Sequence, residues 1–196
     1  MTTDNISIVI NNIRQRRTTK PDKMNGQKIA DEQIQIMLES ADWAPTHGMT
    51  EPWRFVVFAG DAVVAFCKQH AELYRLHTNP ENFMQGNYDK LLHMGDLASQ
   101  IVIAVMQRGY LPKIPAWEEM AATACAVQNL LLTASAMGIA AYWGSGGMAT
   151  HQVMKEHLQI REEDKVMGIL YFGYTNTETA GKRNVPLGDK VRWVFS

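Results

Sequence analysis

The 196-residue sequence predicts an α+β or α/β layer structure in a single domain over residues 1–196, with a sheet between helices. Segments with apolar residues at helical spacing alternate along the chain with short apolar runs that are typical of strands. The length suits one domain of ordinary size and is short for two. No internal repeat interrupts this pattern.

The first part of the chain contains three predicted helices and one strand. An amphipathic helix behind Asp4, its predicted cap, ends around residues 14–17, and a second helix begins at about Asp31. The run WRFVVFAG, residues 53–60, predicts a strand, after which Asp61 caps a third helix. The predicted inner face of this third helix consists of Val63, Phe66, Cys67, His70 and Tyr74.

The second part begins with residues 77–89, which are polar and typical of a mobile surface loop that covers a site. A short helix is expected over 91–97, and IVIAVM, residues 101–106, predicts a strand covered on both faces. A long helix over 116–137 ends at Gly138, which suits a left-handed C-terminal cap. A strand at IAAYW, a helix over 151–158 and a strand over 165–174 follow.

Residues 175–196 form a predicted extended tail. Its last residues include Trp193, Val194 and Phe195, which would expose an apolar terminus to water if the tail were disordered. We therefore expect the tail to pack on something, with a second subunit as the candidate.

The composition excludes several classes of protein. With 19 basic and 20 acidic side chains the net charge is −1, which gives no electrostatic case for nucleic acid or an anionic membrane. Cys67 and Cys125 lie in apolar segments without metal-ligand spacing, which predicts two reduced, buried thiols and no zinc site. Residues 120–150 carry no charge, but polar residues and glycines interrupt them, so we expect a buried helix. The start lacks a secretory pattern, and we expect a cytoplasmic protein.

Two motifs contain candidate ligand contacts. RQRRTTK, residues 14–20, gathers guanidinium and hydroxyl donors that suit a phosphate, although a solvated helix end without a ligand is the alternative. GSGGMA, residues 144–149, formally fits a dinucleotide fingerprint, but the acidic residues downstream precede the next strand and do not follow it. We interpret its glycines as allowing close approach of the backbone to a flat ligand beside Trp143.

The turn APTHGMTEPW, residues 44–53, places His47 and Glu51 directly ahead of a strand. The residue types leave three roles open for His47: general base, ligand contact or polar turn residue. No serine elbow or cysteine–histidine arrangement indicates a nucleophile.

Together these motifs resemble the FMN-dependent nitroreductase family over nearly the whole chain. RRTTK is similar to the family's RRS-x-R/K start, APTHGMTEPWRFVV to its AP(S/D)-x-x-x-x-QPWxF segment, and AYWGSGG to its later flavin loop. The long small-residue helix and the strand KVMGILYFGY, followed by GKRNVP, extend the match. In its length and in the histidine of APTHG, the chain resembles the short single-domain NAD(P)H nitroreductases. The resemblance implies an α+β three-layer sandwich with a central mixed sheet flanked by helices, assembled as an intertwined homodimer.

The resemblance also implies two FMN molecules at the dimer interface, each held by both chains. The phosphate and ribityl contacts would be Arg16, Arg17 and Thr18, with Lys182 or Arg183 as further phosphate candidates. Lys20 would approach the pyrimidine edge of the ring.

The other implied contacts come from two loops. His47 and Glu51 would reach the flavin from the other subunit, and Trp143, Gly144 and Ser145 would border the ring. The long helix would form much of the dimer contact.

The implied activity is that of an oxidoreductase. NADH or NADPH would give a hydride to flavin N5, and a nitroaromatic, a quinone or a similar small molecule would then take the electrons in a ping-pong cycle. Because the flavin carries this chemistry, no catalytic side chain is expected. The alternatives are a flavin-binding or redox-sensing module without efficient turnover, and a Rossmann-like dehydrogenase that uses GSGGMA.

Three residues depart from the family pattern. Lys20 replaces an arginine and loses its planar fork, and Gly144 replaces a residue that is often arginine. Glu51 stands where an amide is usual, and an ionised carboxylate can accept a hydrogen bond but cannot donate one. We hypothesise that the charge of Glu51 disfavours the anionic reduced flavin unless a cation such as Lys20 compensates.

Overall fold

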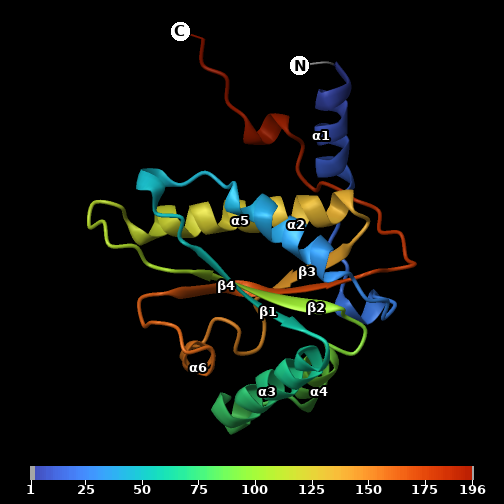
Figure 1. The fold of residues 1–196 in the computed structure, drawn as a ribbon, viewed down its shortest axis with the longest axis vertical. Coiled ribbons are helices and arrows are strands. Elements are labelled where there is room, and N and C mark those ends of the chain that lie inside the picture. The colour runs from blue at the N-terminus through green and yellow to red at the C-terminus, as the bar shows by residue number, and fades with distance from the viewer. Residues whose placement is uncertain (1–2, 196) are drawn as a thin grey trace.

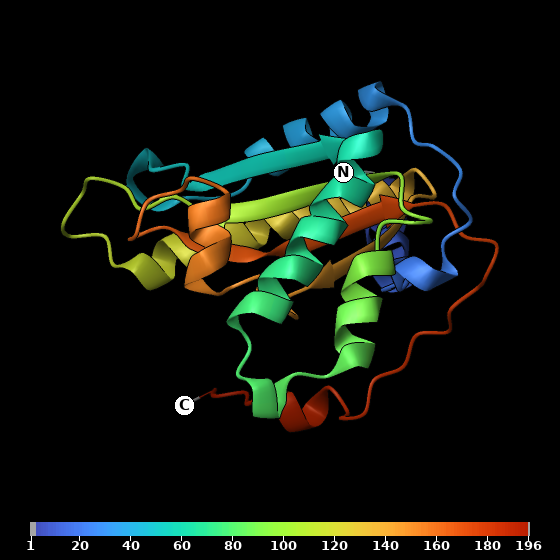
Figure 2. The same cartoon turned by 90° about the horizontal axis from the view of Figure 1, so that it is seen from below.

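The computed structural model describes residues 3–195 and has three layers (Figure 1). Helices α2 (Asp31–Asp42) and α5 (Ala116–Ala136) cover one face of a sheet, and α3 (Asp61–His77), α4 (Gln85–His93) and α6 (Gln152–His157) cover the other. Helices α3 and α4 lie below the sheet in Figure 1, and Figure 2, seen from below, shows them side by side in front of it. The predicted three-layer α+β architecture is confirmed.

The sheet has four strands in the order β1-β2-β4-β3, so β1 and β3 form its two edges. The strands are β1 (Trp53–Ala59), β2 (Gln100–Met106), β3 (Ala140–Gly144) and β4 (Lys165–Gly173). The expected mixed strand directions are wrong for the described residues, because all three ladders are antiparallel. The α3–α4 hairpin returns the chain to the end of the sheet where β1 finished, so Gln100 pairs with Ala59. A doubly wound dehydrogenase needs parallel strands, which this sheet lacks.

Two apolar clusters flank the central strands. The cluster under α2 and α5 includes Met37, Leu130 and Phe172, and the cluster under α3 and α6 includes Phe66 and Ile101. All seven residues of β2 are buried, as expected for a strand covered on both faces. Each such aliphatic or aromatic side chain contributes roughly 1.5–3 kcal/mol, so the sheet forms a stable platform for its edges.

Helix α3 was predicted most completely. All five residues of its predicted inner face are buried. Its N-cap is Gly60, however, and Asp61 lies in the first turn and not at the cap. The core contacts of α3 make it the best-anchored helix on its side of the sheet, since Val63, Phe66 and Cys67 belong to the cluster that packs on β2 and β4.

Helix α4 differs from the prediction. It begins at Gln85 and ends at His93, so the expected loop over 77–89 shrinks to residues 78–84 and the helix expected over 91–97 lies earlier. Of the described residues of α4, Leu91 alone is buried. A helix that buries so few side chains needs few apolar residues, so its sequence shows little apolar periodicity. The remaining loop is packed rather than free, because Phe83 lies 5.6 Å from the ring of Tyr74.

Helix α5 ends as expected. Gly138 has a φ of 71°, and the N–H of Ile139 donates to the carbonyl of Ala134, which closes the last turn. The thiol prediction is half correct, because Cys67 is buried and Cys125 is exposed on α5. Every helix within residues 3–195 is too short or too polar to cross a membrane.

The two ends of the chain are the least packed parts. Helix α1 (Thr3–Gln15) and the tail after β4 both extend beyond the α2/α5 layer (Figure 1). Asp4 lies inside the first turn of α1 and not at its cap. The tail is extended apart from a short turn at Gly188–Lys190. Their exposed large apolar residues are Ile6, Ile8, Val9, Ile10, Ile13, Val185, Leu187, Val191, Trp193, Val194 and Phe195.

Candidate functional site

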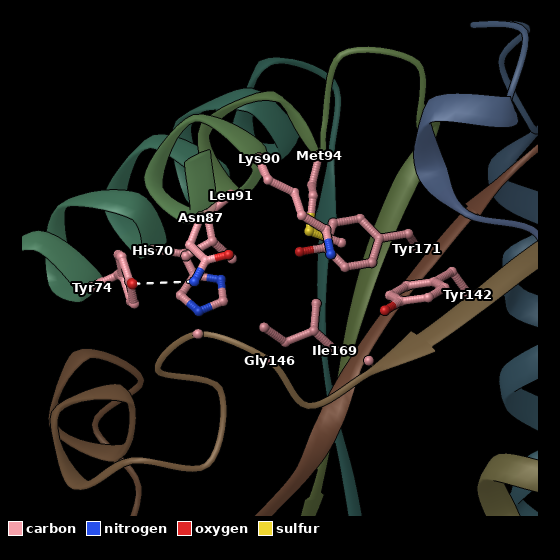
Figure 3. A pocket seen from close by; sticks show the side chains of 12 residues that line it. His70, Tyr74, Asn87, Lys90, Leu91, Met94, Tyr142, Gly146, Ile169 and Tyr171 are labelled. Carbon is pink, nitrogen blue, oxygen red and sulfur yellow. Dashed lines mark hydrogen bonds between the residues drawn. The ribbon is translucent and has the colours of Figure 1, made fainter. Parts of the chain in front are cut away.

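A cavity of about 260 Å³ lies between the α3–α4 hairpin and the β3–β4 edge of the sheet (Figure 3). Two helices, the strands β3 and β4 and one loop form its walls. His70 and Tyr74 come from α3, Asn87 and Lys90 from α4, and Gly144, Gly146 and Gly147 from the end of β3 and the following loop. In Figure 3, His70 and Tyr74 lie at one end of the cavity, and Tyr142 and Tyr171 lie at the other.

The glycine loop after β3, residues 144–147, approaches α3 and α4 very closely. A Cβ on Gly147 would lie 2.6 Å from Nε2 of His70 and 2.9 Å from Leu91, and the φ of Gly147 is 63°. A side chain at this position would therefore be strained and would clash. At Gly147 the backbone approaches the protein's own helices, and the approach to a flat ligand expected from GSGG stays a prediction.

His70 is 1% exposed and anchors this loop. Its Nε2 accepts a hydrogen bond from the backbone N–H of Met148 at 3.0 Å. Burial, and then the charge of His157, lowers the pKa of His70 to about 4, so its imidazole is neutral near pH 7. Nδ1 has no partner among residues 3–195.

Two neutral groups lie next to each other here, because Tyr171, which lines the cavity, contacts the thiol of Cys67. Burial raises the pKa of Cys67 to about 12, although a hydrogen bond with Tyr171 acts in the opposite direction. Burial, and then the proximity of Cys67, raises the pKa of the Tyr171 hydroxyl well above its usual range. The thiol is therefore protonated at neutral pH and is a poor nucleophile.

The basic segment predicted at residues 14–20 runs along the free edge of β3. The N–H of Thr19 donates to the carbonyl of Ala141 at 2.9 Å. Arg16 and Arg17 line a second hollow of about 500 Å³, together with Thr19 and three tail threonines: Thr175, Thr177 and Thr179. Thr18 and Lys20 are exposed beside it.

The tail folds over Arg17. Nε of Arg17 donates to the carbonyl of Thr179 at 3.1 Å, and Nη1 donates to the carbonyls of Arg14 and Arg16. A Cβ on Gly181 would clash with the guanidinium of Arg17. Lys182 and Arg183, which are exposed, directly follow that glycine. The structure therefore brings both predicted groups of phosphate-binding cations to one edge of the sheet.

The three residues expected to border a flat ligand have different surroundings. Gly144 lines the cavity, and Ser145 is exposed at its rim. Trp143 lies between Tyr142 and Gly144 in β3, so its side chain points to the opposite face of the sheet. There its Nε1 donates to the carbonyl of Met167 at 3.0 Å.

His47 and Glu51 lie diagonally across the sheet from the basic segment at residues 14–20. They precede β1, one edge strand, at the end where Trp53 pairs with Met106 and Met106 with Lys165. Thr19 lies on the other edge, near the end where Ala140 pairs with Gly173. One chain therefore does not bring the two groups together.

The local contacts of this turn come from its own neighbourhood. Nδ1 of His47 lies 2.6 Å from a carboxylate oxygen of Glu118, at the start of α5. The N–H of Glu51 donates to the Thr46 hydroxyl at 3.2 Å. Glu51 is exposed, and its φ is 42°.

Asn87 and Lys90 were not among the predicted site residues, because a mobile loop was expected over 77–89 and a helix only from residue 91 onward. A helical signal was present. Asn87, Lys90, Leu91 and Met94 follow the i, i+3, i+4, i+7 spacing, and all four line the cavity.

A family model and a curated relative both match this chain, and both are nitroreductases by name. The model of the nitroreductase family matches residues 13–174. YdjA of Escherichia coli strain K12, named as a candidate NAD(P)H nitroreductase, is 28% identical over 159 residues, which cover 79% of this chain and 82% of YdjA.

Two solved structures have the same fold. A nitroreductase-like family protein from Bacillus cereus superposes with a TM-score of 0.82 at 22% identity, over 96% of both chains. A candidate nitroreductase from Desulfovibrio desulfuricans, solved in complex with FMN, gives a TM-score of 0.73 at 22% identity and covers 96% of this chain and 98% of its own.

Proposed function

The chain belongs to the nitroreductase family, and we propose that it transfers electrons from NADH or NADPH, through bound FMN, to a small organic acceptor such as a nitroaromatic or a quinone. It is an NAD(P)H-dependent flavin oxidoreductase with FMN as its cofactor. The acceptor class and the ping-pong order, in which the oxidised dinucleotide leaves before the acceptor binds, are parts of the proposal.

The arrangement along β3 is the observation that supports this function best. FMN carries an anionic phosphate at one end and a flat ring at the other. Guanidinium groups and hydroxyls lie near the start of β3, and the glycine loop and the cavity lie at its end. The two groups of residues are linked through the hydrogen bond from Thr19 to β3. The residues present therefore fit the cofactor in their chemistry and order.

We assign roles to these residues as part of the proposal. Arg16, Arg17 and Thr18 bind the phosphate and ribityl groups, and Lys182 or Arg183 adds positive charge from the tail. Charge-assisted hydrogen bonds from guanidinium groups to a phosphate are strong and geometrically specific.

The proposed ring contacts are Lys20, from the basic segment, and residues of the cavity at the end of β3. Lys20 and Lys90 supply positive charge to the polar edge of the flavin ring, and Gly144 and Ser145 border it. Bound flavin supplies the redox chemistry, because it accepts a hydride at N5 and passes the electrons on. The protein binds and orients the reactants and excludes water.

A second copy of the chain completes the site in this proposal. The turn at residues 47–51 lies too far from the β3 edge to serve the same chain's flavin, so His47 and Glu51 come from the partner. The exposed apolar residues of α1 and the tail support such a homodimer, because faces of this kind are buried in assemblies. Residues 175–196 then pack on the partner as part of one domain, although Ser196 lies outside the described residues.

The first test is the visible spectrum of the purified protein, before and after NADH and then NADPH are added without oxygen. A yellow protein that bleaches and then regains its colour with a quinone is expected. A yellow protein that stays yellow would instead indicate a flavin-binding or sensing module. A colourless protein that cannot be loaded with FMN would overturn the assignment.

A further inference from the structure

The buried face of α3 carries two polar side chains one helical turn apart. His70 is 1% exposed, Tyr74 is 7% exposed, and both line the cavity. Buried polar atoms normally find hydrogen-bond partners, and the location of these partners shows what the side chains hold in place. Here the partners belong to two different segments, which form opposite walls of the cavity.

His70 holds the glycine loop. Its Nε2 accepts from the N–H of Met148, which directly follows Gly147, and Met148 is itself buried. The acceptor lone pair requires a neutral ring with its proton on Nδ1. Burial keeps the ring neutral at neutral pH, because the pKa of His70 is lowered to about 4. The close packing of Gly147 on the imidazole adds a steric contact to the hydrogen bond.

Tyr74 holds the beginning of α4. Its hydroxyl oxygen accepts from the N–H of Met84 at 3.2 Å and from the Asn87 amide at 3.3 Å, the latter shown as the dashed line in Figure 3. Met84 is the N-cap of α4, and N–H groups at helix starts lack partners within their helix. Tyr74 therefore serves as a cap supplied by a neighbouring helix.

We propose that His70 and Tyr74 are positioning residues, which use α3 as a fixed support to set the distance between the glycine loop and α4. The pair thereby determines the shape of the cavity. Its effect on the flavin rests on the proposed function, which places the ring at the rim formed by the loop. Both side chains act through the walls that they hold and not through the reacting atoms.

Amide hydrogen exchange on the purified protein tests each wall separately. In His70→Leu, the amide of Met148 loses its acceptor, and we expect its exchange to accelerate by about 10- to 100-fold, while the amide of Met84 is unaffected. In Tyr74→Phe, which keeps the ring that packs on Phe83, we expect the reverse pattern. The amide of Ile169 in β4 reports whether the fold as a whole has changed.

His70→Gln is the matched rescue variant, because its side-chain oxygen can reach about as far as Nε2 and accept the same hydrogen bond. We expect it to restore the slow exchange of Met148. Equal exchange of Met148 in the parent protein and His70→Leu would overturn the proposal. Faster exchange at Met148, Met84 and Ile169 together would also overturn it, since that pattern reports general destabilisation.

The flavin readout is the rate at which FMN is released. We expect release to be about tenfold faster in His70→Leu and close to the parent rate in His70→Gln. Unchanged release with accelerated exchange of Met148 would show that the pair sets the cavity without affecting the ring. A protein that binds no FMN would contradict the proposed function, and the exchange experiment would still decide the role of the pair.

Discussion

The two edges of the sheet solve different structural problems: the β3 corner, meaning β3 with the basic segment along it and the glycine loop after it, and the β1 corner, meaning β1 with the turn at residues 47–51 before it. At the β3 corner, the left-handed backbone conformation falls on a glycine, Gly147, which is packed against buried side chains. At the β1 corner, Met49 and Glu51 adopt φ values of 53° and 42°, and both side chains are exposed. Such a conformation costs roughly 1–2 kcal/mol in a residue other than glycine.

The difference separates a corner that is packed within one chain from a turn whose side chains face solvent. The β3 corner has a cavity, cations and a loop held by a buried histidine. The β1 corner keeps backbone strain while its side chains point to solvent, and strain of this kind persists where surrounding structure or function requires it. This contrast supports the proposal that the turn at residues 47–51 acts on a partner's flavin.

The largest expected effect tests the packing of the β3 corner. Gly147→Ala places a methyl group against His70 and Leu91 in a left-handed conformation, and we expect it to lower the free energy of unfolding by about 2–4 kcal/mol. Gly146→Ala is the matched control, because nothing lies within 4 Å of its Cβ position. Urea unfolding of both variants measures the difference. Equal urea midpoints in the two variants would show that the backbone at Gly147 is not closely packed against His70 and Leu91.

The next effect concerns pH. The folded pKa of His70 is about 4, below its unfolded value of roughly 6.5, so the unfolded state binds more protons between these values. Stability is therefore lost as pH falls from about 6.5 to 4, by up to about 3 kcal/mol from this group. The charge of His157 contributes to the lowered pKa. His70→Gln should flatten the pH dependence of the unfolding midpoint, and an unchanged slope would contradict this origin.

Phosphate binding at the β3 edge gives the third prediction. Within residues 3–195 no hydrogen bond from the Arg16 guanidinium is found, whereas Arg17 is held by the tail. Arg16→Gln should therefore weaken FMN binding by about 10- to 100-fold and leave stability almost unchanged. Titration of the variant with FMN measures this loss. Arg192→Gln, in the exposed tail, is the control, and equal affinities in the two variants would argue against the phosphate assignment.

The sequence predicted local features well and long-range ones poorly. The inner face of α3 and the buried run of β2 follow from periodicities within single segments, which the chain itself displays. The antiparallel β1–β2 ladder depends on how the α3–α4 hairpin returns the chain, and the other two ladders depend on the connections through α5 and α6. Periodicity within single segments carries no information about these connections.

The candidate site shows the same limit. The motif at residues 14–20 was sufficient to propose cations for a phosphate, and the structure places Arg16 and Arg17 together at one hollow. The side on which Trp143 points follows from the register of β3 with β4, which no short motif encodes. Asn87 and Lys90 were missed because α4 buries so little apolar surface that its helical pattern is weak.

The fourth prediction concerns the charge of Glu51 at the β1 corner. If the turn reaches a partner's flavin, Glu51→Gln removes a negative charge that disfavours the reduced, anionic ring. We expect the midpoint potential of bound FMN to rise by about 30 mV, which corresponds to roughly 1.4 kcal/mol for two electrons. A dye-coupled reductive titration measures it. An unchanged potential would place Glu51 away from the ring.

The smallest expected effect on stability is at the pair formed by His47 and Glu118. Their side chains are 60% and 27% exposed, so a double-mutant cycle with alanine should give a coupling below about 1 kcal/mol. If the β1 corner acts only across the dimer interface, His47→Ala should nevertheless slow turnover while the unfolding midpoint barely moves. Turnover that remains at the parent rate would show that the exposed histidine serves only its own turn, and the contrast between the two corners would then be one of packing alone.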